Sequence, residues 1–408
     1  MIIQEESTVK NGSKGDWFVC QIGAREDYAV ARVLHQRGCL AGLITDAWVR
    51  SDSWGSAVFP QRLRERWHCE LSDVRVSAST ILSSARNVWG QARWRTGWNS
   101  IMARNLWFQK EAARRLKGFS GDQHTIFSYS YAAGEIFTEA KQRGWRTVLG
   151  QIDPGPVEAR LVSELYKKAG QKYAYEEIPG EYWDLWRREI ALADKIVVNS
   201  AWSREALIAE GVAAEKIAII PLAYEGKRQA SRSQLVATFI PERPLRLLFL
   251  GQVTFRKGID LVFEAMLLLP DLPIELDVVG PIQVDIPESV RHDARIRIRG
   301  PVRRSQTEAF YKQADLFLFP TYSDGFGLTQ LEAMAAGLPV IASRFCGDVV
   351  QDGINGRVLQ AMEADELADI IRELAEDPGQ LSRLQENSYV EKRFHLDAIG
   401  RQLEDLFT

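Results

Sequence analysis

Two carboxylates and two glycines follow an apolar segment in the second half of the chain. Residues 316–320 read LFLFP, and the SDGFGLTQLE segment that soon follows places Asp324 eight positions before Glu332. Because glycine has no Cβ, glycines at 325 and 327 let the backbone pass close to a ligand. Peptide N–H groups on such a turn can donate to phosphate or sugar oxygens. A carboxylate one turn into the next helix suits the vicinal hydroxyls of a ribose. The predicted contacts are Gly325, Phe326, Gly327, Leu328, Thr329 and Glu332. The alternative is an ordinary glycine turn with two solvated acids.

A second candidate site is the loop at residues 251–258, which reads GQVTFRKG. The loop leaves one predicted strand and enters a predicted helix. N–H groups at a helix N-terminus favour an anion, and Arg256 and Lys257 add full positive charge there. We therefore expect Gln252, Arg256 and Lys257 to contact a bound phosphate group. The alternative is a solvated basic pair after a strand.

Length and composition limit the kind of protein in which these residues can stand. The 408 residues suggest two domains, and a net charge of -3 gives no reason to expect nucleic acid as a partner. The four cysteines lack the spacing of a zinc site or a disulfide framework, which favours a reducing compartment; they are Cys20, Cys39, Cys69 and Cys346. No apolar run reaches the roughly 18 residues of a membrane span. We expect a cytoplasmic protein, or one peripheral to a membrane.

Short apolar runs alternate with longer amphipathic ones along the whole chain, the pattern of parallel sheets wound with helices. The rhythm begins with DWFVCQIG and starts again with LRLLFLG. The sequence therefore predicts two Rossmann-like, doubly wound α/β domains that face each other across a cleft. We place the first at residues 1–224 and the second at 225–389, with a C-terminal helix at 390–408 that packs back on the first domain.

Such domains bind ligands at the carboxyl ends of their strands. In NAD dehydrogenases the first strand leads into GxGxxG, whereas here the turn reads QIGAREDY with Gly23 alone. The hypothesis that the first domain binds a dinucleotide such as NAD therefore loses its main support.

The segments together resemble retaining glycosyltransferase family 4, the glycosyl transferases group 1, whose fold is called GT-B. The resemblance covers most of the chain and is strongest from about 185 to 360, through ALADKIVVNSAWSREAL, LFLGQVTFRKGIDL and ADLFLFPTYSDGFGLTQLEAMAAGLPVIAS. The family signature is Glu-x7-Glu. Its second acid holds the nucleotide ribose and its first lies near the donor sugar, which implies these roles for Glu332 and Asp324.

The chain departs from the family pattern at several positions. Asp324 is one methylene shorter than the usual glutamate, and Gln252 stands where the family commonly has arginine. Arg256 is a candidate to supply the missing charge. None of the five histidines falls where family members carry them in the first domain. Asp153, after a predicted strand, is the best polar candidate for catalysis there, beside Asp324; its alternative role is to cap the turn before Pro154.

The resemblance implies sugar transfer from a nucleoside diphosphate sugar to an acceptor with retention of configuration, in glycan, polysaccharide or glycolipid synthesis. The acceptor is a saccharide, a lipid-linked molecule or a small molecule. No Asp-x-Asp follows a predicted strand, so we expect no metal and no cofactor. The alternative is a non-catalytic nucleotide-sugar-binding or partner subunit of the same fold, and a dehydrogenase or epimerase stays open on fold alone.

A basic, aromatic segment at residues 86–118 carries eight Arg or Lys, one acid, four Trp and one Phe. Basic residues beside interfacial aromatics favour contact with an anionic membrane or an anionic acceptor. The alternative is a pair of solvated helices whose tryptophans belong to the core.

Overall fold

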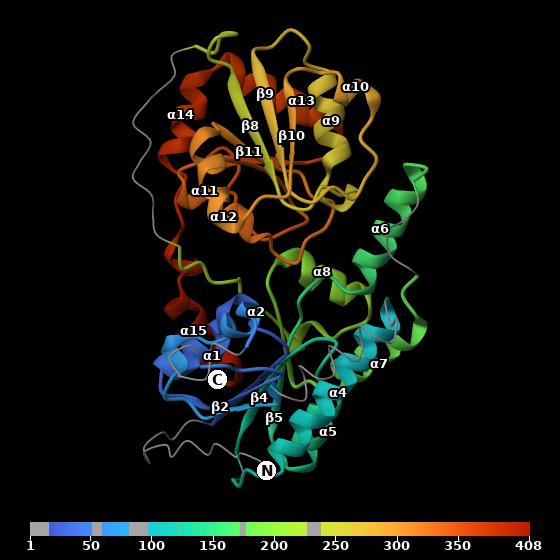
Figure 1. The fold of residues 1–408 in the computed structure, drawn as a ribbon, viewed down its shortest axis with the longest axis vertical. Helices are drawn as coiled ribbons and strands as arrows, with labels where there is room; N and C mark the ends of the chain where they lie inside the picture. The colour runs from blue at the N-terminus through green and yellow to red at the C-terminus, as the bar shows by residue number, and fades with distance from the viewer. Residues whose placement is uncertain (1–15, 51–58, 81–96, 122, 172–176, 227–237) are drawn as a thin grey trace.

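The chain folds into two lobes, each built around one parallel sheet (Figure 1). The computed structural model describes residues 16–50, 59–80, 97–121, 123–171, 177–226 and 238–408. The first sheet has the strand order β3-β2-β1-β4-β5-β6-β7. Its strands are β1 (Trp17–Gln21), β2 (Leu40–Thr45), β3 (Val76–Ala78), β4 (Thr125–Tyr129), β5 (Arg146–Gly150), β6 (Lys195–Val198) and β7 (Ile217–Ile219).

The second sheet has the order β10-β9-β8-β11-β12-β13. Its strands are β8 (Leu245–Leu250), β9 (Ile274–Val279), β10 (Ile296–Gly300), β11 (Leu316–Phe319), β12 (Val340–Ser343) and β13 (Gly356–Leu359). All pairings in both sheets are parallel. In each sheet the order reverses beside the first strand of the lobe, which is the switch point where such folds open a crevice.

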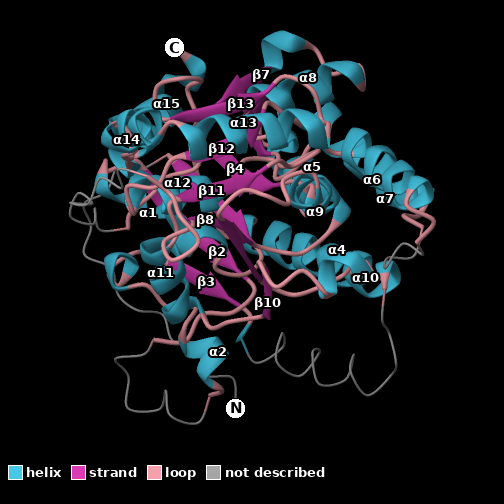
Figure 2. Cartoon of the chain, turned by 90° about the horizontal axis from the view of Figure 1, so that it is seen from above, coloured by secondary structure: helices cyan, strands magenta, loops and turns pink. Residues whose placement is uncertain are grey.

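Helices cover both faces of the sheets, as the view down the long axis shows (Figure 2). This explains the near-continuous apolar strands, because a strand buried on both faces has no polar side. The first lobe contains α1 (Ala29–Gln36), α2 (Gln61–Arg64), α4 (Trp98–Leu116), α5 (Gly134–Gln142), α6 (Pro156–Lys168), α7 (Gly180–Leu192) and α8 (Ala201–Ala209). The later helices are α9 (Ile259–Leu267), α10 (Glu288–Arg291), α11 (Arg304–Gln313), α12 (Leu328–Ala335), α13 (Ala364–Glu376), α14 (Pro378–Glu386) and α15 (Leu396–Glu404).

The last helix leaves the second lobe and returns to the first, where Figure 1 shows α15 beside α1. Its apolar residues Leu396, Ile399 and Leu403 pack in the same core cluster as α1. A Cβ at Gly400 would overlap the side chain of Val33, so a glycine permits the close approach of the two helices. The polypeptide therefore crosses between the lobes twice, once before β8 and once before α15.

Candidate active site

The basic loop after β8 is held in place by its own sequence. Residues 255–257 form a 3-10 turn, and the Thr254 hydroxyl accepts a hydrogen bond from the Lys257 N–H at 3.3 Å. Gly258 has φ 73°, and a Cβ there would overlap the carbonyl oxygen of Pro320 at the end of β11. Glycine is therefore required at 258, and it brings the basic pair against the loop that carries Asp324.

Lys257, Arg256 and Asp324 form one cluster of charges. The Lys257 ammonium makes a close ion pair with the Asp324 carboxylate, and an Arg256 guanidinium nitrogen lies 3.8 Å from the same carboxylate. Burial raises the pKa of Asp324, but the two cations outweigh that effect and hold its pKa below the usual value. Asp324 is therefore anionic at neutral pH, and a diphosphate that approaches Lys257 must compete with it.

The loop after β11 also touches the first lobe. A Cβ on Gly325 would lie only 2.6 Å from the carbonyl oxygen of Ile152, so this glycine allows the two backbones to meet. The Trp202 indole N–H donates to the Ser323 hydroxyl at 3.0 Å. The predicted donor loop is thus part of the contact between the lobes.

Glu332 lies in α12, as the spacing predicts, and accepts a hydrogen bond from the Tyr311 hydroxyl at 2.8 Å. No side chain caps the N-terminus of α12, which follows Gly327. Among the described residues, the buried hydroxyl oxygen of Thr329 has no hydrogen-bond partner. These features leave polar groups at the start of α12 for a ligand.

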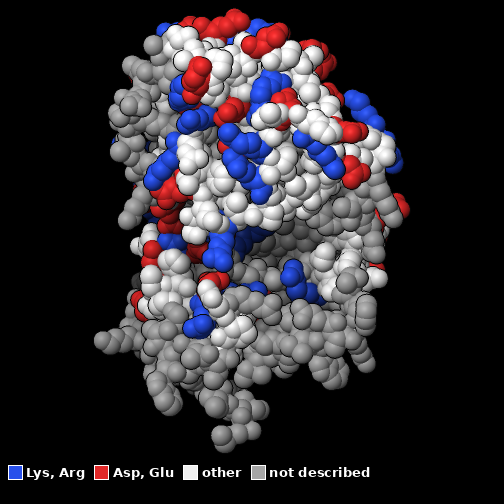
Figure 3. All heavy atoms as spheres, turned by 45° about the horizontal axis from the view of Figure 1, so that its top comes forward, with Lys and Arg blue, Asp and Glu red and all other residues white. Residues whose placement is uncertain are grey.

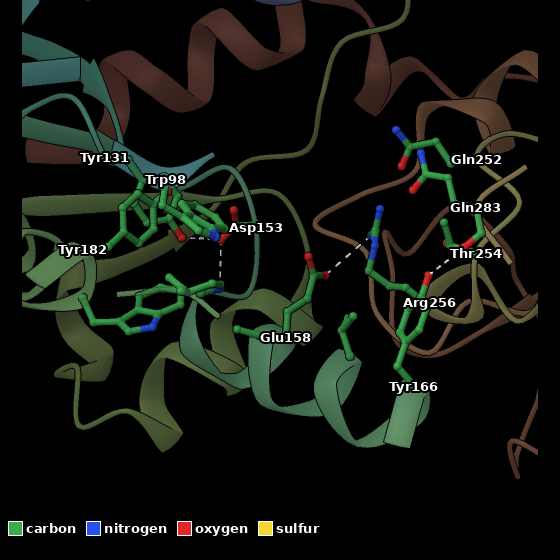
Figure 4. A pocket seen from close by; sticks show the side chains of 15 residues that line it. Trp98, Tyr131, Asp153, Glu158, Tyr166, Tyr182, Gln252, Thr254, Arg256 and Gln283 are labelled. Carbon is green, nitrogen blue, oxygen red and sulfur yellow. Dashed lines mark hydrogen bonds and ion pairs between the residues drawn. The ribbon is translucent and has the colours of Figure 1, made fainter. Parts of the chain in front are cut away.

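A cavity of about 210 Å³ lies between the lobes. Its first-lobe side includes Asp153, which follows β5, and its second-lobe side includes Gln252 and Arg256. Figure 4 shows these two sides facing each other, and the space-filling view in Figure 3 shows a hollow with Lys or Arg side chains beside it. A larger cavity of about 590 Å³ between α6 and α9 contains none of the predicted site residues.

The carboxyl group of Asp153 accepts hydrogen bonds from neighbouring protein groups. The Tyr131 hydroxyl donates to its Oδ1 at 2.6 Å, and the Gly155 N–H donates to the same oxygen at 2.9 Å. Burial raises the pKa of Asp153, although both hydrogen bonds oppose that rise. The Gly155 contact is the turn cap that the sequence allowed, and the same carboxyl group also lines the cavity, so the two alternatives do not exclude each other.

Glu158 is a site residue that the sequence reasoning missed. Its carboxylate lies 3.6 Å from Arg256 and accepts a hydrogen bond from the Ser323 hydroxyl at 2.7 Å. Burial raises its pKa to about 7, although Arg256 beside it lowers the value. The signal was Pro156, a typical first residue of a helix, which predicts the start of α6 and places Glu158 in its first turn.

The structure places five of the eleven predicted site residues in or beside the cavity and the other six outside it. Asp153, Gln252 and Arg256 line the cavity. Asp324 lies beside it through its contact with Arg256, and Lys257 pairs in turn with Asp324. Glu332 and residues 325–329 lie outside the lining. Their assigned roles remain predictions.

The described part of the basic segment is α4, and residues 86–96 lie outside the described residues. Trp107 packs partly buried against the first-lobe core, and Trp98 lines the cavity. Among the residues that the structure describes, no helix is long and apolar enough to cross a membrane. Within the same residues, no group of three or more His, Cys, Asp or Glu side chains is arranged to hold a metal ion.

Two doubly wound domains with their strand ends at one cleft define the GT-B class of fold. Solved structures of this kind align with almost the whole chain. HepE of Anabaena in complex with UDP has a TM-score of 0.60 at 16% identity, over 95% of this chain and 98% of that chain. Sucrose-phosphate synthase of Thermosynechococcus elongatus has a TM-score of 0.63 at 18% identity, and the alignment covers 96% of this chain and 98% of that chain. The predicted fold class is confirmed.

Residues 244–377 match the family model described as Glycosyl transferases group 1, so this part of the second lobe is a domain of that type. A D-inositol 3-phosphate glycosyltransferase 1 of Catenulispora acidiphila is 30% identical over 221 residues, 48% of this chain and 52% of that protein. A D-inositol 3-phosphate glycosyltransferase of Nocardia farcinica is 27% identical over 299 residues, which are 67% of this chain and 63% of that protein. The chain spans about half the length of most of these curated relatives.

Proposed function

We propose that this protein is a glycosyltransferase that moves a sugar from a uridine diphosphate sugar to an acceptor bound in the cleft, with retention of configuration. The observation that carries the proposal is the position of Arg256 and Lys257. Both cations follow β8 at the switch point of the second sheet and lie beside the glycine loop after β11. Uridine is chosen as the base because the aligned Anabaena structure is a complex with UDP.

In this account the second lobe binds the donor. The diphosphate accepts hydrogen bonds from Lys257, Arg256 and the N-terminus of α12, and Glu332 holds the ribose hydroxyls. As the bond to the sugar breaks, negative charge grows on the departing diphosphate. Fixed cations stabilise that charge more than they stabilise the bound donor, which lowers the barrier. Lys257 and Arg256 would then supply the positive charge that a metal ion supplies elsewhere.

The first lobe binds the acceptor in the same account. Retaining glycosidases place a second carboxyl group about 5 Å from their nucleophile, and no such pair is assigned among the donor residues. We therefore infer a front-face reaction in which the departing phosphate takes the acceptor proton. Asp153 and Glu158 orient acceptor hydroxyls from the first-lobe side of the cavity. The protein is placed in the cytoplasm, with residues 86–118 as its contact to an anionic membrane.

A second candidate function is a binder of nucleotide sugars without catalysis. The ion pair between Lys257 and Asp324 favours it, because this carboxylate already neutralises the cation assigned to the diphosphate. Gln252, at the start of the loop after β8, also lacks the positive charge that an arginine would offer to a diphosphate.

A turnover assay separates the two functions. The full chain is incubated with UDP-glucose, UDP-galactose or UDP-N-acetylglucosamine, and released UDP is measured with and without a panel of glycosides. UDP release that needs both Lys257 and an acceptor supports transfer, and the anomeric proton coupling of the product reports retention. UDP binding without any release would support the binder.

A further inference from the structure

Four aromatic side chains form one wall of the cavity, and we name them the aromatic corner: Trp98, Tyr131, Tyr182 and Trp183. The Tyr131 and Tyr182 rings stack at 4.7 Å between centroids with 18° between planes. Trp98 lies 4.9 Å from Tyr182, and Trp183 meets Tyr182 edge-on at 5.2 Å. The four rings come from α4, from the loop after β4 and from α7, and Figure 4 shows Trp98, Tyr131 and Tyr182 gathered around Asp153.

The backbone of Tyr131 has an unusual conformation. Its φ is 72°, in the left-handed region that bulky residues rarely adopt. Its N–H donates to the buried carboxylate of Glu189 at 2.6 Å, and its hydroxyl donates to Asp153 at 2.6 Å. The same Glu189 accepts hydrogen bonds from the N–H groups of Ala133 and Gly134. Strained residues fixed from several sides concentrate at functional sites, which makes Tyr131 a candidate contact for substrate.

Acidic side chains outnumber basic ones beside the aromatic corner. Asp153 and Glu158 both line the cavity, and Arg256 is the one Lys or Arg among its lining residues in the described part of the chain. That cation lies 3.6 Å from Glu158 and 3.8 Å from Asp324, so two carboxyl groups already share it. The other cation that acts on Asp153 is Arg25, which pairs with Glu26 at 3.5 Å. An anion on the first-lobe side would therefore meet Asp153 and Glu158 beside cations that carboxyl groups already pair with, and like charges repel strongly where water is scarce.

We propose that the aromatic corner binds an uncharged pyranose ring of the acceptor, stacked by its C–H face on Trp98, which the buried Tyr182 ring supports, with a hydroxyl group donating to Asp153. This proposal rests on the proposed function and narrows the class of acceptor. An uncharged pyranose differs from the inositol phosphate for which several relatives are named. A pyranose matches both surfaces, since it offers an apolar face to the rings and hydroxyl donors to the carboxylate. Apolar walls with a few placed polar groups are the usual form of a small-molecule site.

The test measures which acceptor class binds the full chain. Methyl glucoside, methyl galactoside and methyl mannoside, myo-inositol 3-phosphate and choline are titrated by saturation-transfer NMR and tryptophan fluorescence, with and without UDP. We expect at least one methyl glycoside to bind through its ring C–H protons, and the inositol phosphate to bind at least about tenfold more weakly. Binding of the inositol phosphate or of choline in preference to all three glycosides would overturn the proposal, as would no glycoside binding at all.

Variants connect the binding to the aromatic corner. Tyr182→Ala should weaken glycoside binding by about tenfold, because it removes the central ring of the stack. Tyr182→Phe keeps the ring and should stay within about twofold of the parent protein. Tyr389→Ala, at an exposed tyrosine of the second lobe, is the matched control. Equal affinity in Tyr182→Ala and the parent would contradict the assignment.

The UDP titration keeps this inference distinct from the proposed function. If UDP binds and no glycoside does, the acceptor assignment is wrong while the donor site stands. If a glycoside binds through Tyr182 and UDP does not, the aromatic corner is a saccharide site and the transferase proposal fails.

Discussion

The Arg256 guanidinium lies 3.6 Å from the Glu158 carboxylate, in an ion pair that crosses from the second lobe to the first. Ser323 joins both partners, because its hydroxyl donates to Glu158 at 2.7 Å and its carbonyl accepts from Arg256 at 2.8 Å. A donor phosphate that draws Arg256 toward itself must therefore weaken a contact that holds the lobes together. In the proposed function, this cluster couples three events: binding of the diphosphate, protonation of Glu158 and approach of the lobes.

Replacing Asp324 with asparagine should strengthen UDP binding. The change removes a carboxylate that makes an ion pair with Lys257 and would repel a diphosphate. We expect affinity to rise by roughly threefold to tenfold, on the scale of about 1 kcal/mol, while sugar transfer falls because a contact to the donor sugar is lost. Calorimetric titration of UDP and an assay of UDP release measure the two effects. Asp369→Asn, at an exposed carboxylate on α13, is the control. Weaker UDP binding in Asp324→Asn would mean that Asp324 supports the phosphate site instead of competing for it.

The stability contributed by Glu158 should fall as pH rises. Its folded pKa of about 7 lies above the ordinary value of 4.5 because burial disfavours the charged form. The folded state therefore binds this proton more tightly, and the associated stability is fully present below about pH 4.5 and lost as pH rises through about 7. Arg256, Asp153 and Asp324 face the same carboxyl group and set the size of the effect.

Thermal melts of Glu158→Gln and the parent protein measure this contribution. The variant should gain stability relative to the parent between about pH 5 and about pH 8, by at most a few kcal/mol. Glu205→Gln, at an exposed position on α8, should show no such trend. A difference in Tm between Glu158→Gln and the parent that is constant over this range would show that the carboxyl group titrates at its ordinary pKa.

Adding a methyl group at Gly325 should impair catalysis more than donor binding. A Cβ there would lie 2.6 Å from the carbonyl of Ile152 and push the two loops apart. Displacement by about 1 Å at a reacting centre can cost on the order of a hundredfold in rate, so we expect kcat to fall by about tenfold to a hundredfold. Gly118→Ala is the control, because its Cβ would meet only the Arg115 carbonyl at an ordinary 3.4 Å. Full kcat in Gly325→Ala would show that the lobes need not meet here during the reaction.

The sequence predicted the fold well where apolar periodicity was strong. LRLLFL and LFLF became β8 and β11. The last strand, β13, was missed because GRVL is short and half-polar. Such edge strands are fixed by pairing with a neighbour, here β12, which no local pattern reveals.

The candidate site was predictable on the donor side and much less so on the acceptor side. Arg256 and Lys257 stand in a short loop before a predicted helix, which favours an anion, and the resemblance to a known family implied a role for Asp324. The aromatic corner instead assembles Trp98, Tyr131 and Tyr182 from three elements far apart in sequence. Trp98 lies in the basic, aromatic segment that the sequence singled out. Only the folded chain brings the three rings together, so the positions of Tyr131 and Tyr182 carried no signal.

The most direct test of a nucleotide-sugar site in the cleft is a thermal-shift titration with UDP, GDP, ADP, CMP, TDP and NAD. The account predicts that UDP raises the Tm most, and that Lys257→Ala and Glu332→Ala each lose most of this shift. Loss of one charge-assisted contact, about 1.5–3 kcal/mol, should weaken UDP binding by roughly tenfold to a hundredfold. Lys312→Ala, at an exposed lysine on α11, should keep the full shift. An equal shift in all the variants, or a shift with NAD alone, would contradict the account.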